Sequence, residues 1–377
     1  MTIDFYAVEN ATEEAVRHGV FPGAVLLVGR GADVIYERAF GWRSLVPDQS
    51  AMESSTIFDL ASLTKPLATT IAIMLLVDEK KVRLDDHVTQ FVPTFSFFAK
   101  TPTRIRHLLN HTSGLPAWKP YYEEVIKCEN SGRTHFVGSR AAKSYIMEQI
   151  HRERPFSEPG TQALYSDLGF MVLGEVVETI SGSALDLFCH DRIFQPLGLR
   201  STGFVDLTQR STWQIKTNEN KIAPTELCPW RKKVLRGEVH DDNAFAVGGV
   251  AGHAGLFSCA RDIHAVVAQL DRCLRGCNSF LPQPLVQEFL TKDDTVSHST
   301  HALGWDTPTP EKSSSGMHFS RKSVGHLGFT GTSLWWDLEK NCHVILLSNR
   351  VHPTRNNEKI KRFRPSIHDL IMQAVNP

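Results

Sequence analysis

The spacing of apolar positions divides the start of this chain into recognisable elements. Residues 4–18 carry apolar side chains on one helical face, and the pattern ends at Gly19. Two strand-like runs follow at 24–29 and 33–40, separated by a glycine-containing turn. A helical stretch of about 62–82 is apolar on most sides, which predicts a helix buried in the core.

The pattern changes in the middle of the chain and returns near its end. Short helical patterns interrupted by turn signals give way after about residue 250 to helical spacing and closing strands. The predicted elements are helices at 141–151, 168–180, 261–274 and 366–374 and strands at 332–338 and 343–348. We therefore expect a mixed α/β (α+β) fold. Residues 1–95 and 250–377 form an antiparallel sheet flanked by helices, and 96–249 form a mostly helical inserted domain.

Charge and composition exclude some classes of partner. The 41 basic residues balance 41 acidic residues, so nothing indicates binding to nucleic acid or to an anionic membrane. No apolar run approaches the ~18 residues of a membrane-spanning helix. The first 23 residues lack the basic start and apolar stretch of a signal peptide. A cytoplasmic protein with no nucleic-acid or membrane partner is the expectation.

The cysteines and histidines give no pattern for a metal. The seven cysteines are an odd number without a paired framework, which favours reduced thiols in a cytosol-like compartment. Cys273 and Cys277 lie four apart, unlike the C-x-x-C spacing of metal and redox sites. His240-Asp241-Asp242 resembles a ligand group, but no second cluster accompanies it and H-E-x-x-H is absent. We expect no metal.

The run Ser62-Leu63-Thr64-Lys65 is the first candidate for chemistry. If Ser62 opens the helix, Lys65 lies three residues later on the same face. The free N–H groups at a helix N-terminus favour negative charge developing on the serine. A partly desolvated lysine can lose its proton and act as a base. The same pattern is also typical of a capped helix with an exposed lysine.

A tyrosine motif and a glycine-rich motif follow. Tyr165 begins Tyr-Ser-Asp just before a helical pattern, and a phenol of lowered pKa near an ammonium can pass a proton between serine and leaving group. Many tyrosines simply pack in the core. Near the end, the run G-H-L-G at 325–328 leads into F-T-G-T-S at 329–333. Glycines beside a strand allow a ligand to approach the backbone, although they also suit a hairpin connection.

The order of these three elements, about 100 and 160 residues apart, resembles that of the class C β-lactamase group. That group also contains D,D-peptidases and family VIII esterases, with the signature S-x-x-K, Y-x-N and K-T-G or H-T-G. The resemblance spans nearly the whole chain and implies a β-lactamase/transpeptidase-like fold. Further matching stretches are FPGAVLLVGR at 21–30, HLLNHTSGLP at 107–116, GGVAGHAGLFSCARD at 248–262 and GFTGTSLWWD at 328–337.

The resemblance implies three catalytic residues. Ser62 would be acylated, and Lys65 and Tyr165 would share the work of general base and acid. The backbone N–H groups of Ser62 and Phe329 would bind the oxyanion. No metal or organic cofactor is needed for this chemistry.

The resemblance also implies substrate-binding positions, two of which depart from the family pattern. His326 takes the place of the third-motif lysine or histidine, followed by Leu327 in place of threonine and by the motif glycine Gly328. Asp167 replaces the usual asparagine, and an ionised aspartate only accepts hydrogen bonds, so it would hold Lys65 charged or favour a substrate N–H. The run Phe329-Thr330-Gly331 also fits x-T-G, so two positions for the third motif remain open.

These residues predict a serine hydrolase with its active site in the cleft between the sheet and the inserted region. The departures weaken the grip on a carboxylate, so we expect an esterase or D-amino-acid peptidase with weak β-lactamase activity. Its partner would be a small-molecule ester, peptide or β-lactam. A non-hydrolytic penicillin-binding or scaffold protein of the same fold is the alternative. The sequence specifies neither the natural substrate nor the oligomeric state.

Overall fold

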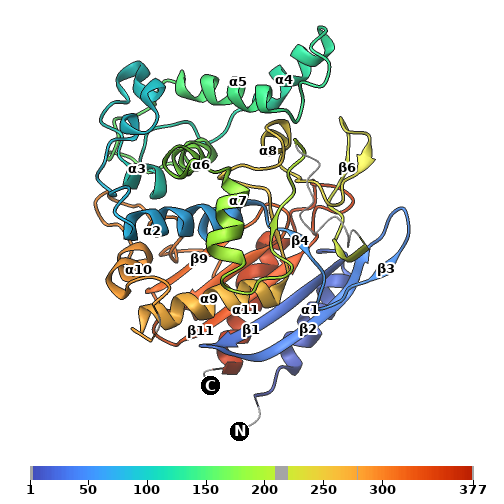
Figure 1. Ribbon diagram of the computed structural model, residues 1–377. Coiled ribbons are helices and arrows are strands. Elements are labelled where there is room, and N and C mark those ends of the chain that lie inside the picture. The colour runs from blue at the N-terminus through green and yellow to red at the C-terminus, as the bar shows by residue number, and fades with distance from the viewer. Residues whose placement is uncertain (1–2, 209–219, 278, 376–377) are drawn as a thin grey trace.

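Both ends of the chain build one antiparallel sheet (Figure 1). The computed structural model describes residues 3–208, 220–277 and 279–375. Within them the strand order is β3-β2-β1-β11-β10-β9, so the first long strand lies beside the last. The bounds are Gly23–Arg30 (β1), Asp33–Ser44 (β2), Ser50–Ala51 (β3), Ser323–Leu327 (β9), Ser333–Asp337 (β10) and Cys342–Ser348 (β11). The predicted fold class is confirmed.

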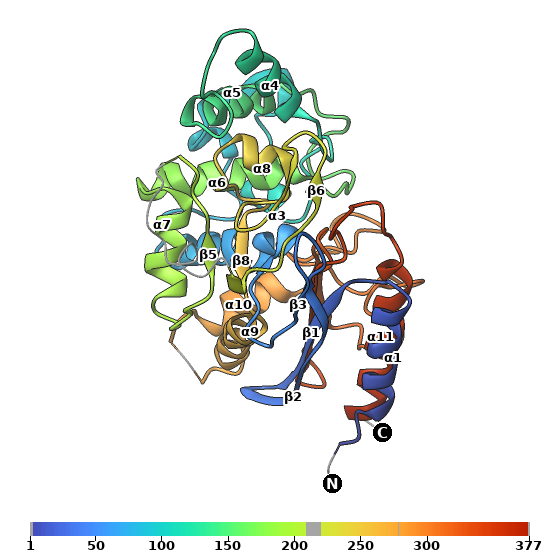
Figure 2. The same ribbon diagram turned by 90° about the vertical axis from the view of Figure 1, so that its right-hand side faces the viewer.

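Alternating side chains of the sheet enter two different cores. Leu26 and Trp335 belong to one apolar cluster, whereas their neighbours Leu27 and Trp336 belong to the other. This follows from the two-residue period of a strand. Figure 2 shows the sheet nearly edge-on, with α1 and α11 on one face and α9 and α10 on the opposite side. These helices are Tyr6–Arg17 (α1), Ala260–Leu274 (α9), Gln283–Leu290 (α10) and Ile360–Val375 (α11).

The middle of the chain is mostly helical and lies on the side of the sheet that carries α9 and α10 (Figures 1 and 2). Its helices are Ile105–Leu109 (α3), Tyr121–Asn130 (α4), Arg140–His151 (α5), Asp167–Ser181 (α6), Leu185–Cys189 (α7) and Asp242–Ala246 (α8), with the short helical turns Val88–Gln90 (η3), Pro93–Ala99 (η4) and His190–Phe194 (η5). Its short strands are Gly203–Phe204 (β5), Leu227–Cys228 (β6) and Lys233–Val234 (β7). β5 pairs with Leu256–Ser258 (β8), which also pairs with Phe58–Asp59 (β4), so this small sheet joins the middle to the end segments. The domain boundaries at 95 and 249 stay a prediction.

Two predicted helix boundaries were wrong. The core helix ends at Asp78 (α2, Ile71–Asp78) rather than at 82, because Lys80 takes a left-handed φ of +58° and the N–H of Lys81 returns to the carbonyl of Leu76. The last helix begins at Ile360, six residues before the expected 366, and continues through Pro365. Proline is taken as a stop in a sequence pattern, but Pro365 lies inside this helix, which continues without the backbone N–H of that residue.

The expectation that no stretch is long enough to cross a membrane also needs correction. Among the described residues, the run Ala61–Asp78 has the length and apolar composition of a membrane span. However, 83% of this run is buried inside the protein. Its composition is accounted for by its place at the centre of the larger apolar core.

Candidate functional site

Ser62 lies in a strained turn at the start of the central helix. The chain leaves β4, turns through Ala61–Leu63 (η1) and continues as Lys65–Thr70 (η2) into α2. Ala61 has a φ of +47°, which is costly for a residue with a Cβ atom. Asp59 Oδ1 accepts the N–H of Ala61 at 2.9 Å and so holds this conformation. The turn brings Lys65 Nζ to 3.0 Å from Ser62 Oγ.

Lys65 is fully buried and ion-paired. Its Nζ donates to Asp167 Oδ1 at 2.6 Å and to the carbonyl of His253 at 3.3 Å. Asp167 is the first residue of α6, which Ser166 caps by accepting the N–H of Gly169. Burial alone would lower the pKa of Lys65, but Asp167 and Tyr165 outweigh burial and raise it. Lys65 is therefore charged at neutral pH.

Tyr165 lies against Lys65, with its ring centroid 4.8 Å from Nζ. The sequence reasoning assumed a phenol of lowered pKa, and this was wrong. Burial raises the pKa of Tyr165 to about 12, and the opposing effect of Lys65 is smaller. At neutral pH both Lys65 and Tyr165 thus carry a proton.

His326 and Ser62 line one cavity, in which His326 is a neutral hydrogen-bond acceptor. Its Nδ1 lies 2.9 Å from the carbonyl of Leu327, which can only accept, so Nδ1 carries the hydrogen. Nε2 is buried without a hydrogen-bond partner among the described residues. Burial lowers the pKa of His326 to about 4, against the attraction of Asp306. At neutral pH His326 is therefore uncharged, unlike the lysine that can stand at this position of the third motif.

A turn after β9 is tied to the chain just before Ser62. Thr330 Oγ1 donates to the carbonyl of Asp59 at 2.7 Å, and Thr332 Oγ1 donates to that of Leu60 at 3.0 Å. A Cβ on Gly328 would lie 1.9 Å from Thr332 Oγ1, so this position requires glycine. The cavity is lined by His326, Leu327 and Gly328 and not by Thr330, whose hydroxyl is engaged in this bond.

The cavity has a volume of about 610 Å³ and lies between the end segments and the helical middle. Six of the seven predicted site residues line it, and Lys65 is buried behind Ser62. Phe329 and Trp118 keep 52% and 45% of their surface exposed, and they give the cavity an apolar wall. The six residues are Ser62, Tyr165, Asp167, His326, Gly328 and Phe329.

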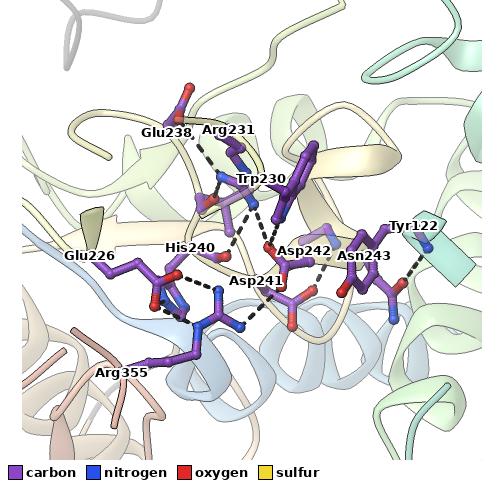
Figure 3. Close-up of polar contacts among 12 residues, drawn as sticks. Tyr122, Glu226, Trp230, Arg231, Glu238, His240, Asp241, Asp242, Asn243 and Arg355 are labelled. Carbon is purple, nitrogen blue, oxygen red and sulfur yellow. Dashed lines mark hydrogen bonds and ion pairs between the residues drawn. The ribbon is translucent and has the colours of Figure 1, made fainter. Parts of the chain in front are cut away.

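A polar network beside the cavity, shown in Figure 3, was not predicted from the sequence. Arg355 pairs with Glu226 and Asp242, and Asp242 Oδ1 also accepts from Arg231 Nη2 at 3.0 Å. Burial would raise the pKa of Glu226, but His240 and Arg355 lower it to about 2. The signal in the sequence was His240-Asp241-Asp242, whose side chains pair with neighbouring residues.

The network also supports Phe329. The ring of His240 stacks on that of Phe329 with centroids 5.6 Å apart, and the Arg350 guanidinium lies 4.5 Å from the same ring. His253, whose carbonyl accepts from Lys65, joins Asp241 through Nε2 at 3.0 Å. An exposed aromatic ring is thereby held beside Ser62.

Histidines, carboxylates and cysteines form neither a metal-ligand group nor a disulfide among the described residues. Within 3–208, 220–277 and 279–375, no group of three or more His, Cys, Asp or Glu residues is placed to hold a metal ion. The seven cysteines form no disulfide, and five of them are buried. The cytoplasmic location stays a prediction.

Comparisons with known proteins give relatives along almost the whole chain. A family model described as Beta-lactamase matches residues 8–368. An Escherichia coli (strain K12) protein, provisionally named a D-alanyl-D-alanine carboxypeptidase, is 32% identical over 363 residues, covering 88% of this chain and 79% of that protein. N-acetylmuramyl-L-alanine amidase of Bacillus subtilis (strain 168) is 31% identical over 370 residues, covering 92% and 80%.

Solved structures share the fold. The hydrolase EstCE1, described as having promiscuous acyltransferase activity, has a TM-score of 0.73 at 23% identity over 97% of both chains. The octameric penicillin-binding protein homologue from Pyrococcus abyssi has a TM-score of 0.72 at 21% identity, over 98% of this chain and 77% of that one. At these identities the likeness concerns the fold alone.

The buried network predicts a large stability effect at Arg231. Arg231→Met should lower the free energy of unfolding by about 3–5 kcal/mol. The substitution removes one ion-pair partner of Asp242 and the side-chain donor to the carbonyls of Val239 and His240. Arg152→Met is the control, since its ion pair with Glu148 is exposed and should contribute less than about 1 kcal/mol. Urea unfolding measures both. Equal effects would mean that the network does not stabilise this wall.

Proposed function

This chain belongs to the β-lactamase family and is a serine hydrolase, and from that premise we propose that it cleaves an amide bond of a small peptide through an acyl-enzyme on Ser62. The observation that carries the proposal is Lys65 Nζ, held 3.0 Å from Ser62 Oγ. The names of the two curated relatives, a carboxypeptidase and an amidase, both specify amide bonds. Activated esters should serve as more reactive substrates of the same site.

In the proposed reaction one proton moves when the bond from Ser62 to the substrate forms, and one moves when the C–N bond breaks. Once the Lys65–Tyr165 pair has lost one proton to solvent, Ser62 Oγ attacks the substrate carbonyl and gives its proton to the pair. The N–H groups of Ser62 and Phe329 stabilise the tetrahedral oxyanion. The pair returns the proton to the leaving amine as the C–N bond breaks. A water then attacks the acyl carbon and gives a proton to the pair, which returns it to Ser62 Oγ as the ester bond breaks.

The cavity wall supports a peptide over a β-lactam. Neutral His326 and Leu327 offer a substrate carboxylate neither a positive charge nor a hydroxyl, which weakens the hold on a β-lactam and on a free peptide C-terminus alike. Asp167 lines the cavity as an acceptor, which suits the N–H of a peptide. The exposed rings of Phe329 and Trp118 suit an apolar group beside the scissile bond. Peptides ending in a D-amino acid are the first substrates to test.

Ser62→Ala should abolish turnover of p-nitrophenyl butyrate and of a D-alanyl-D-alanine peptide, because it removes the nucleophile. Nitrocefin should turn over slowly. The control is Cys259→Ala, since burial raises the pKa of that thiol to about 11 and leaves it unreactive.

Steady-state assays with intact-mass measurement after mixing distinguish the outcomes. Turnover that survives in Ser62→Ala would refute the proposed mechanism. A lasting adduct on Ser62 without continuing product would instead identify a penicillin-binding protein that does not hydrolyse. Rapid nitrocefin hydrolysis would show that His326 and Leu327 do not limit β-lactam recognition.

The pH profile tests the ion pair. Because Lys65 and Tyr165 both start protonated, one proton must leave the pair before attack, and kcat/KM should rise with pH. Asp167→Asn removes the charge that raises the pKa of Lys65, so the rising limb should move to lower pH by about one unit or more.

Glu358→Gln is the control for this profile, since Glu358 is a carboxylate at the same cavity that pairs with Lys361. Its rising limb should stay where it is in the wild type. An unmoved limb in Asp167→Asn would show that the proton lost before attack does not belong to the Lys65 cluster.

A further inference from the structure

Arg364 of α11 is buried beneath the turn that carries Phe329. Its Nη2 donates to the carbonyls of Gly328 and Thr332, at 3.0 and 2.8 Å. Only 6% of the residue is exposed. No carboxylate of the described residues forms an ion pair with it, so a buried cation is held by backbone carbonyls. Charge-assisted bonds of this kind are shorter and stronger than neutral ones.

The Gly328 carbonyl and the Phe329 N–H belong to the same peptide unit. The unit is trans, because the cis bonds of the described residues are Val46-Pro47 and His352-Pro353. In a planar trans peptide the C=O and the N–H point in opposite directions. Arg364 holds the C=O, so the N–H of Phe329 points to the other side of the peptide.

The rest of the turn is fixed by similar contacts. The N–H of Gly331 returns to the Gly328 carbonyl at 3.1 Å, which closes a turn with Phe329 as its second residue. Arg350 Nε and Nη2 donate to the next carbonyl, that of Phe329, at 2.8 and 2.6 Å. Both peptide units around Phe329 are thereby anchored through their carbonyls, and hydroxyl bonds from Thr330 and Thr332 join the turn to the segment before Ser62.

We propose that Arg364 is a positioning residue that aims the N–H of Phe329 at the oxyanion by holding the carbonyl of the same peptide unit from the opposite side. The bond also polarises that peptide and makes its N–H a stronger donor. The inference rests on the proposed function, because it assumes that Ser62 forms a tetrahedral intermediate. It assigns to Arg364, a helix residue that lines the cavity, a role exerted through the Gly328–Phe329 peptide rather than on the substrate itself.

The test is Arg364→Met, which we expect to fold. The Gly328 carbonyl keeps the N–H of Gly331, and the Thr332 carbonyl keeps the N–H of Gly328 at 2.8 Å. With p-nitrophenyl butyrate, kcat should fall about 10–100-fold, less than the 10²–10³-fold typical of deleting an oxyanion donor. KM should change less than about threefold, because a misaimed donor weakens the transition state more than the ground state.

A boronic acid that forms a tetrahedral adduct on Ser62 provides a second readout. Its inhibition constant should rise in parallel with the loss of kcat, which a merely structural role would not produce. Arg364→Lys keeps the charge but replaces the planar fork with a single ammonium, so an intermediate loss of about 3–10-fold is expected. Lys361→Met is the matched control on the same helix, since it removes an exposed cation of the same cavity that bonds to Glu358 instead of to the turn.

The outcomes separate the two proposals. If Ser62→Ala keeps its turnover, the proposed function fails. If Ser62→Ala is inactive and folded Arg364→Met keeps kcat within twofold of the wild type, the positioning role alone fails. An equal loss in Lys361→Met would overturn it too, by assigning the effect to cavity charge. Should Arg364→Met not fold, wild-type kcat in Arg364→Lys would overturn the inference.

Discussion

A buried ammonium determines how the parts of this molecule meet. Removing the Lys65 charge from water is costly unless its hydrogen bonds are all satisfied. Its acceptors come from three distant segments: Ser62 in the turn after β4, Asp167 at the start of α6 and the carbonyl of His253 before β8. The helical middle must therefore dock on the central helix for the lysine to be buried, and the same docking completes the site.

The cavity wall that carries Phe329 depends on backbone carbonyls that accept hydrogen bonds from buried arginines. Arg350 and Arg364 bind backbone oxygens of the turn after β9, and two threonine hydroxyls fasten that turn to the segment before Ser62. Ser62 and Phe329 are thus fixed relative to one another by hydrogen bonds to the backbone of this turn and of the segment before Ser62. Preorganised donors of this kind need no rearrangement during the reaction, which makes electrostatic stabilisation effective.

The sequence predicted what depends on local geometry. Strand β11 and helix α9 follow directly from apolar spacing, and Lys65 lies on the face of Ser62 because three residues make about one helical turn. The pairing of Lys65 with Asp167, 102 positions away, is not local, and only the family resemblance brought the two motifs together. Arg364 could not be found at all. A charged residue in K-R-F-R-P reads as exposed, and its burial follows from a helix that starts before a proline.

The central claim is that Ser62 and Phe329 form one acyl-transfer site, and a crystal structure of the enzyme inactivated by an alkyl fluorophosphonate tests it most directly. The account predicts a phosphonyl group on Ser62 Oγ, with its oxygen within hydrogen-bond distance of the N–H groups of Ser62 and Phe329. A label on another residue would contradict the account. So would a phosphonyl oxygen turned away from Phe329.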